Sequence, residues 1–435
     1  MQRATPVLAL PRRRRHPPAQ GNLVKLLVAT DVTRYLNFKS IGGCYVYKRG
    51  AGIHKVPATK EEALGTSLLS LLQKNYLRSL LMAIDAYKVD DPKTWKGNMD
   101  WRKSTCAGAF VPHGRLEEAS PAPARAGPRV SCDASRALPP SPLFLALSLF
   151  ARPELFKYMW FDKDTSDFVG HAMALEESDD YLSRPALPAM EAVRLYGESL
   201  ARYGSSPFIY PEYGLGGLPE GFSRLCAIHN GTFMLNKDVT EILYNADGTV
   251  AGVRSGKGDD AEVALAPLVV GDPSYFPAAR KVKTGRIIRT ICVLNHPVAG
   301  LTGSAADSAM IILPASQVGR KNDIYITVVG KHHETAAKNR YIAIVSTTVE
   351  TATPEKEVEA GLALLGEMVT RFNNISDTYA PKDDGRASKV FVTASYDATS
   401  HFEATTDEIL DVYARIFGEA FDLTKPVTLP AEGMS

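Results

Sequence analysis

The chain is poor in the features that hold together small secreted proteins, metalloproteins and nucleic-acid-binding proteins. Its 435 residues contain only five cysteines, which are widely scattered and form neither a CxxC pair nor a metal-ligand spacing. A reducing compartment is the simplest expectation. Lys and Arg number 50 against 48 Asp and Glu, so the chain lacks the overall charge that would hold nucleic acid or an anionic membrane. We therefore expect no nucleic-acid partner, and any membrane contact must be local.

Long apolar runs are also absent. The most apolar stretch, Leu143 to Ala151, is far shorter than the roughly 20 residues that a membrane-spanning helix requires. The sequence therefore predicts no transmembrane segment. A hydrophobic content of 45% over this length is enough for roughly two to three soluble domains with ordinary cores.

Motifs for catalysis are missing as well, because the sequence contains no GxSxG, GxxxxGK or CxxC pattern. The run His332-His333-Glu334 has no second ligand at helical spacing, and we interpret it as a surface pair in a turn. We expect no catalytic residue, no metal and no cofactor. The chain is predicted not to be an enzyme.

A glycine-rich run from Gly214 to Gly221 raises the possibility of a phosphate-binding loop. A dinucleotide fingerprint follows a strand and opens a helix within a strand–helix–strand unit. Here Tyr210-Pro211-Glu212-Tyr213 precedes the glycines and Pro219 interrupts them. We therefore interpret the glycines as permitting a close approach of two backbones, ahead of a short helix from Gly221 to Ile228.

Two segments differ in composition from the rest of the chain. Residues 1–20 are basic and rich in proline, which is typical of a disordered start, with a nuclear or organellar address as the alternative. Residues 107–153 are also rich in proline and small residues and show no periodicity. We interpret this second segment as an insertion, with a functional binding loop as the alternative.

The remaining patterns predict an α/β domain that is interrupted by a helical one. Residues 58–202 are predicted to be helical, with Thr59 and Glu62 spaced as a capping box. Residues 21–57 and 203–435 are predicted to form the larger α/β domain. Its predicted elements are a helix from Gly21, a hairpin over 44–56, strands at 232–235, 239–244, 250–253, 287–293, 324–329 and 341–346, and helices at 355–372 and 407–417.

Several long stretches together resemble one protein family. They are SLARYGSSPFIYPEYGLGGLPEGFSRLCAIHNGTFMLNK at 199–237, and LVKLLVATDVTRYL, DDPKTW, GHAMAL, DDYL, IAIVSTTVET and SYDATSHFE. These stretches resemble Rab GDP dissociation inhibitors, over nearly all of Gly21 to Asp422 apart from the proline-rich insert. Rab escort proteins belong to the same superfamily but carry much longer insertions, so the compact spacing favours the inhibitor branch.

The resemblance implies both a fold and a function. The expected fold is a flavin-monooxygenase-like sheet domain interrupted by a smaller all-helical, prenyl-binding domain. The expected function is to bind prenylated Rab GTPases in the GDP form, slow GDP release, shield the geranylgeranyl lipid and recycle Rabs between membrane and cytosol. Such a protein is cytoplasmic and touches membranes transiently. The alternatives are a Rab escort protein, a flavin-dependent oxidoreductase and a misfolded, truncated product.

The resemblance also implies site residues. Arg224, Thr232, Phe233 and Met234 match the Rab-binding platform, and Arg202, Tyr203 and Phe208 match a mobile loop that contacts membranes. The residues expected to line the prenyl pocket are Leu77, Leu81, Phe156, Met159 and Phe168.

The sequence departs from the family pattern in three places. The family's first strand–helix–strand segment, with its Asp-Arg-Asn and Tyr-Tyr-Gly-Gly run, has no counterpart, and residues 1–20 stand in its place. Gly217 stands where the family usually has Glu, which removes a charge that faces the Rab. The insert interrupts the helices that are expected to hold the lipid.

Overall fold

A computed structural model describes residues 21–66, 68–106, 155, 159, 161–256, 258, 261–399 and 402–425. The basic start, the proline-rich insert and Phe156 lie outside these residues. The chain divides into two compact units, which are considered separately below. The first unit comprises Met1–Leu68, Phe168–Asp179 and Glu191–Ser435, and the second comprises Leu69–Asp167 and Asp180–Met190.

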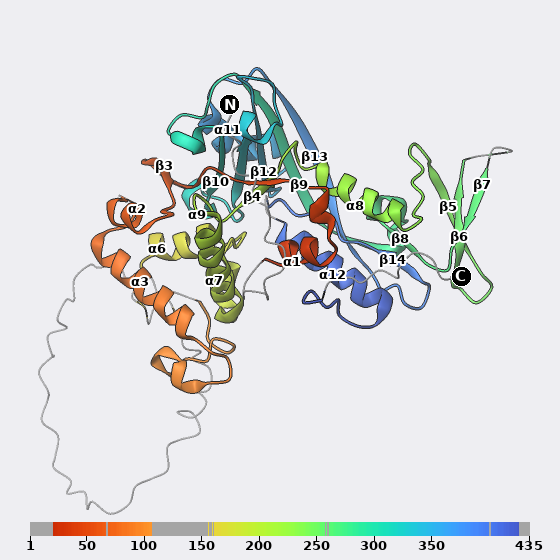
Figure 1. The fold of residues 1–435 in the computed structure, drawn as a ribbon, viewed down its shortest axis with the longest axis horizontal. Coiled ribbons are helices and arrows are strands. Elements are labelled where there is room, and N and C mark those ends of the chain that lie inside the picture. The colour runs from red at the N-terminus through yellow and green to blue at the C-terminus, as the bar shows by residue number, and fades with distance from the viewer. Residues whose placement is uncertain are drawn as a thin grey trace, which may run out of the picture. The chain divides into compact units, whose positions relative to one another are not determined.

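The first unit is built on a seven-stranded mixed sheet, which confirms the α/β fold class (Figure 1). The strand order is β13-β9-β12-β11-β10-β2-β3, and every neighbouring pair is antiparallel except the parallel pair of β10 and β2. The strands are β2 (Cys44–Lys48), β3 (Gly52–Lys55), β9 (Lys281–Leu294), β10 (Ser308–Leu313), β11 (Ile324–Val329), β12 (Tyr341–Thr348) and β13 (Thr370–Pro381). The predicted hairpin over 44–56 is confirmed, and Gly50 at its turn has a φ of 77°.

The short helix α10 (Pro354–Glu357) leads into α11 (Glu359–Leu365), and α11 packs on this sheet. A Cβ on Gly361 would lie 2.8 Å from Val345 Cγ1, so the glycine lets α11 approach the strands closely. The predicted helix over 355–372 is wrong in its second half. Gly366 follows α11 with a φ of 75°, and the chain then enters β13.

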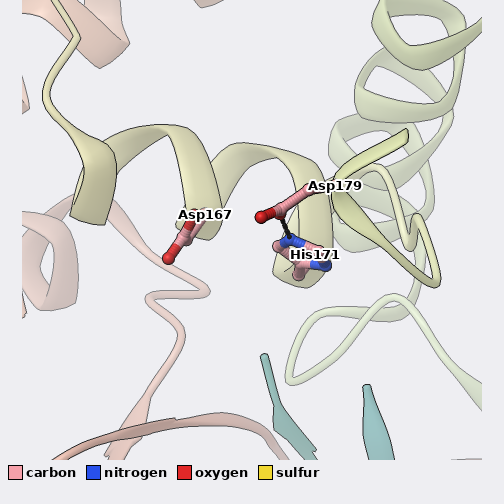
Figure 2. Close-up of side chains that lie close together, drawn as sticks. All are labelled: Asp167, His171 and Asp179. Atoms are coloured by element: carbon pink, nitrogen blue, oxygen red, sulfur yellow. Dashed lines mark hydrogen bonds and ion pairs between the residues drawn. The ribbon is translucent and has the colours of Figure 1, made fainter. Parts of the chain in front are cut away.

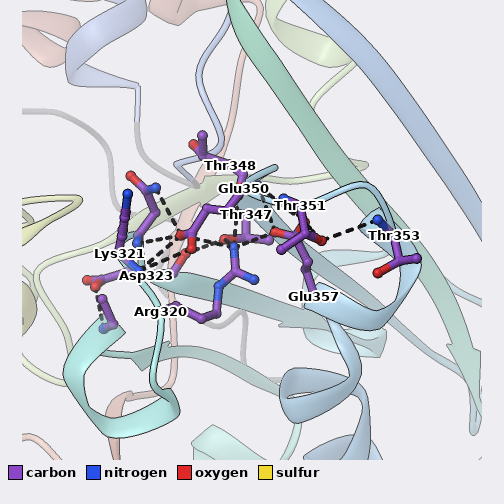
Figure 3. Close-up of polar contacts among 11 residues, drawn as sticks. Arg320, Lys321, Asp323, Thr347, Thr348, Glu350, Thr351, Thr353 and Glu357 are labelled. Atoms are coloured by element: carbon purple, nitrogen blue, oxygen red, sulfur yellow. Dashed lines mark hydrogen bonds and ion pairs between the residues drawn. The ribbon is translucent and has the colours of Figure 1, made fainter.

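An ion cluster around the buried carboxylate of Glu357 ties the loop before β11 to the segment after β12. The Arg320 guanidinium lies 2.7 Å from Glu357 Oε2 and 3.2 Å from Glu350 Oε1 (Figure 3). Glu357 also accepts hydrogen bonds from the backbone N–H groups of Glu350 and Thr351. Hydrogen bonds of this kind lower the pKa of Glu357 against the opposing effect of burial, so the carboxylate stays charged.

A buried histidine fixes the 168–179 segment within the same unit. His171 lies in a π-helix (Phe168–Met173), and its Nδ1 lies 2.8 Å from Asp323 Oδ2. Its Nε2 lies 3.0 Å from Oδ1 of Asp179, which Figure 2 shows beside the ring. The Asp323 backbone N–H donates to the carbonyl of Glu177 at 3.0 Å. Burial, together with Asp397 and Asp323 nearby, raises the pKa of Glu177 to about 7. The segment is therefore held by polar contacts as well as by apolar packing.

Smaller elements complete the first unit. The helices are α1 (Asn22–Ala29), α2 (Lys60–Gly65), α7 (Ala186–Tyr203, whose first residues belong to the second unit), α8 (Gly217–Ile228), α9 (Ala315–Val318) and α12 (Glu403–Phe417). The other strands are β1 (Phe38–Ser40), β4 (Ile209–Pro211), β5 (Val239–Tyr244), β6 (Val250–Ser255), β7 (Glu262–Leu265), β8 (Val269–Gly271) and β14 (Val390–Val392). The predicted hairpin of 239–244 with 250–253 is confirmed, because β5 and β6 pair in antiparallel.

The second unit centres on α3 (Leu71–Ala86), which begins with a capping box of Ser70 and Gln73. Beyond its end, the rings of Tyr87 and Trp101 stack with centroids 4.0 Å apart. Backbone hydrogen bonds then join distant parts of this unit, since the Ala186 N–H donates to the Ser104 carbonyl at 2.8 Å. The described helices include none that is long and apolar enough to cross a membrane.

Candidate functional site

One side of helix α8 carries glycines that pack against the side chain of Leu36. A Cβ on Gly221 would lie 3.0 Å from Leu36 Cγ, and one on Gly217 would lie 3.6 Å from Leu36 Cδ2. The predicted short helix from Gly221 to Ile228 is confirmed, although α8 begins earlier, at Gly217. The glycines admit a leucine side chain rather than a second backbone. The opposite side of α8 is left exposed.

Arg224 projects from α8 over an aromatic ring. Its guanidinium carbon lies 5.0 Å from the centroid of Tyr35, which follows the 3-10 turn Val32–Arg34. A guanidinium in this position is attracted by the face of the ring, and its N–H donors at the edge of the guanidinium plane stay available for hydrogen bonds. Arg224 is exposed, and within the described residues it has no hydrogen-bonded or ionic partner. It is therefore ordered by the ring and open to an acidic partner.

The chain leaves α8 through a tight turn into an exposed apolar loop. The Gly231 N–H donates to the Cys226 carbonyl at 3.0 Å, and Asn230 and Asn236 adopt φ values of 65° and 59°. Between them lie Thr232, Phe233, Met234 and Leu235, and the last three are 52%, 68% and 89% exposed. The predicted strand over 232–235 is wrong, since this loop pairs with no strand among the described residues. We call α8 with its flanking segments 213–216 and 229–236 the α8 surface.

A second exposed aromatic, which the sequence patterns did not indicate, lies at the other end of α8. Tyr213 is 73% exposed and has a φ of 69°. Its backbone N–H donates to the His333 carbonyl at 2.8 Å. Beneath it, Lys39 Nζ lies 2.7 Å from Glu212 Oε1 and donates to the His332 carbonyl at 2.8 Å. The backbone that carries Tyr213 is thus joined to two other segments.

His333 supports this end of the α8 surface from within. It is fully buried, so the prediction of a surface histidine pair is wrong for this residue. Its ring meets Tyr210 edge-on at 5.4 Å, and neither ring nitrogen has a hydrogen-bond partner among the described residues. Burial, with His332 and Lys39 nearby, lowers the pKa of His333 to about 4. The imidazole is neutral at physiological pH.

The residues expected in a membrane loop lie at the end of α7. Arg202 is exposed, and burial raises the pKa of Tyr203. Gly204 ends the helix with a φ of 87°. Phe208 packs against the buried cluster that contains Ile41. In this structure Phe208 is therefore half-buried against the core.

The expected prenyl-pocket residues are divided between the two units. Leu77, Leu81 and Met159 belong to the second unit, whereas Phe168 belongs to the first. Met159 and Phe168 are buried, Leu77 is half-buried and Leu81 is exposed on α3. The described residues of the second unit therefore include apolar side chains of α3 that solvent can reach, Leu77 and Leu81, and a buried apolar residue, Met159.

Comparisons with known proteins agree on one relationship. The family model described as GDP dissociation inhibitor matches residues 16–119 and 145–427. The chain is 41% identical to Rab GDP dissociation inhibitor beta of Rattus norvegicus over 404 residues, which cover 93% of this chain and 78% of that protein. It is also similar to the crystal structure of a Rab GDI from Plasmodium falciparum, with a TM-score of 0.75, 38% identity and coverage of 92% of this chain and 81% of that one.

Proposed function

Because the chain belongs to the GDP dissociation inhibitor family, we propose that it binds prenylated Rab GTPases in the GDP form. In this proposal the α8 surface holds the regions of the Rab that surround its nucleotide, so that GDP leaves slowly. The helical second unit covers the geranylgeranyl lipid during transit between membranes. The protein acts as a cytosolic carrier that contacts membranes transiently.

The observation that carries the proposal is the exposed apolar loop after α8. Soluble proteins leave few large apolar side chains side by side in water, and such sites commonly bind partners. Phe233 and Met234 are such neighbours, and Arg224 on α8 is free to meet acidic groups. Aromatic residues and Arg are enriched among the residues that dominate binding energies, and Met is enriched at interfaces.

Slowing of GDP release follows if the protein binds Rab–GDP more tightly than nucleotide-free Rab. By linkage, the ratio of the two affinities equals the factor by which the carrier raises the affinity of Rab for GDP. Contacts to the Rab regions that move during GDP release make binding to Rab–GDP tighter than binding to nucleotide-free Rab. We place Arg224, Thr232, Phe233 and Met234 at these contacts.

The proposed membrane and lipid contacts involve other parts of the chain. Arg202 offers a charge for lipid phosphate, and Tyr203 adds an aromatic group at the same helix end. Phe208 packs against the cluster that contains Ile41, so in this proposal it reaches a membrane only when the segment after α7 moves away from that cluster. Leu77, Leu81, Phe156 and Met159 of the second unit remain our candidates for the lipid site, where each buried methylene contributes about 0.8 kcal/mol. Phe168 belongs to the first unit and remains a separate candidate for contact with the lipid.

The test is extraction of a geranylgeranylated Rab–GDP from liposomes. We expect the wild-type chain to move Rab into the supernatant and the double variant Arg224→Ala, Met234→Ala to lose at least about tenfold in affinity, as at interface hot spots. Arg254→Ala is the matched control, because Arg254 is an exposed arginine of β6 that already pairs with Glu241 on β5, whereas Arg224 lies on α8 itself. A wild-type chain that neither extracts Rab nor slows GDP release would refute the proposal.

A variant without residues 107–153 separates the insert from this activity. If the insert is a passive addition, the shortened chain extracts Rab–GDP as well as the full chain does. Loss of extraction on deletion, with an unchanged melting temperature, would instead identify the insert as part of the binding apparatus.

A further inference from the structure

Resting on the proposed function, we infer that Tyr213 is a second anchor for the GTPase, presented from the N-terminal end of α8. The first anchor is the loop that contains Phe233 and Met234, at the other end of the helix. Tyr213 belongs neither to the platform residues that the sequence suggested nor to the core of the unit.

The first argument is the backbone of Tyr213. Nine non-glycine residues in the described chain have a positive φ, and Tyr213, at 69°, is the single aromatic among them. Four of the nine are Asn and one is Asp, the types that tolerate this conformation best because their short side chains bond locally. A bulky ring in this region is strained, and strain of this kind persists where the surroundings enforce it.

The second argument is that the ring gains little from the fold. Tyr213 remains 73% exposed, so burial of the ring does not offset the strained backbone. A glycine or asparagine would fit this turn with less strain. An exposed aromatic held in an unfavourable conformation is therefore better explained by an external contact than by stability.

The third argument is the rigidity of its support. The Glu212 N–H donates to the Asn37 carbonyl at 2.8 Å, and the Tyr213 N–H donates to the His333 carbonyl at the same distance. Lys39 joins these segments again through Glu212 and the His332 carbonyl. Because the backbone is already fixed, an incoming partner does not have to order it, and this lowers the entropic cost of binding.

The fourth argument is position. Gly217 donates its N–H to the Gly214 carbonyl at 3.2 Å, so Tyr213 leads directly into the first turn of α8. The helix has 12 residues, which at about 1.5 Å per residue separates its two ends by about 18 Å. An aromatic at one end and Phe233 with Met234 at the other give a GTPase two separated apolar contacts. Two such contacts fix the orientation of the partner as well as its affinity.

The experiment measures binding of geranylgeranylated Rab–GDP, with melting temperature as the readout of folding. Tyr213→Gly and Tyr213→Asn both remove the ring and both suit a positive φ. We expect each to keep or raise the melting temperature and to weaken Rab binding by about 10- to 30-fold, which approaches the lower limit of an interface hot spot. Tyr213→Phe should bind within about threefold of wild type, since the ring is kept.

The kinetics and a control complete the test. Loss of an apolar anchor raises the dissociation rate and leaves the salt dependence of association unchanged, whereas Arg224→Ala changes that salt dependence. Tyr275→Asn, at an exposed aromatic after β8, should bind as wild type does. Wild-type affinity in Tyr213→Gly, or loss of affinity together with a lowered melting temperature, would overturn the inference. Failure of wild type itself to bind would refute the proposed function instead.

Discussion

The seven-stranded sheet and the α8 surface use large apolar residues in opposite ways. In β10 and β11 every residue is buried, and residues such as Ile326 meet the helices that cover the sheet. On the α8 surface, Tyr213, Phe233 and Met234 point into solvent, and the neighbouring backbone is fixed by hydrogen bonds and left-handed residues. The first region stabilises the fold by burial, and the second keeps apolar area available to a partner. Substitutions should therefore change stability in one region and binding in the other.

The largest expected effect is in the ion cluster beside the sheet. Arg320→Ala leaves the buried carboxylate of Glu357 without its cation, and breaking a buried pair in this way costs about 3–5 kcal/mol. Chemical denaturation measures the change. Arg254→Ala removes one partner of an ion pair whose side chains are 45% and 53% exposed, so it should cost less than about 1 kcal/mol. Equal effects of the two variants would show that the buried cluster contributes no more than a surface pair.

A pair of apolar truncations tests the comparison directly. Ile326→Ala opens a cavity beneath Gly361 of α11 and should lower the free energy of unfolding by about 2–5 kcal/mol. Leu235→Ala removes a similar side chain that is 89% exposed, and should change that free energy by less than about 0.5 kcal/mol. The same denaturation curves report both. A large loss in Leu235→Ala would mean that the α8 surface is part of the core.

The two regions also differ in how far their sequence predicts them. The run Ile324–Val329 is apolar and β-branched, and its predicted bounds agree with β11. Because both faces of such a strand are buried, nearly all of its residues are apolar, and this run is visible in the sequence. By contrast, the sequence patterns do not predict β13 (Thr370–Pro381), because it is a polar edge strand. Its first residues fall within the predicted helix over 355–372, whereas the observed helix α11 ends at Leu365.

The α8 surface was harder to derive from patterns. Thr232 to Leu235 has strand-like composition, but the left-handed residues Asn230 and Asn236 flank it, and no strand in the described part of the chain pairs with it. Only the family resemblance indicates Arg224, Phe233 and Met234, and their roles stay predictions. Tyr213 and the burial of His333 depend on contacts between segments far apart in the sequence. The spacing of apolar residues along one segment does not predict contacts with a distant segment.

Acid should weaken the support of the α8 surface. His333 has its pKa lowered from 6.5 to about 4 by burial, so between these values the unfolded chain binds a proton that the folded chain does not. The free energy of unfolding is therefore not reduced by His333 above about pH 6.5. As the pH falls towards 4, that free energy decreases by on the order of 2–3 kcal/mol. His333→Phe removes the titrating group and should flatten this part of the stability curve. The difference between the two curves isolates His333 from the other titrating groups, and an unchanged slope would contradict the assignment.

The smallest expected effect concerns Arg224 and the ring beneath it. Tyr35→Leu removes the aromatic face that lies 5.0 Å from the guanidinium carbon, and an exposed contact of this kind contributes about 0.5–1 kcal/mol. The melting temperature should therefore change little. Rab–GDP affinity should fall by a few-fold, about 2- to 5-fold on the same scale, because the freed arginine must be ordered when it meets the partner. In an Arg224→Ala background Tyr35→Leu should have no further effect on affinity. An equal effect in both backgrounds would show that Tyr35 contacts the partner itself instead of orienting Arg224.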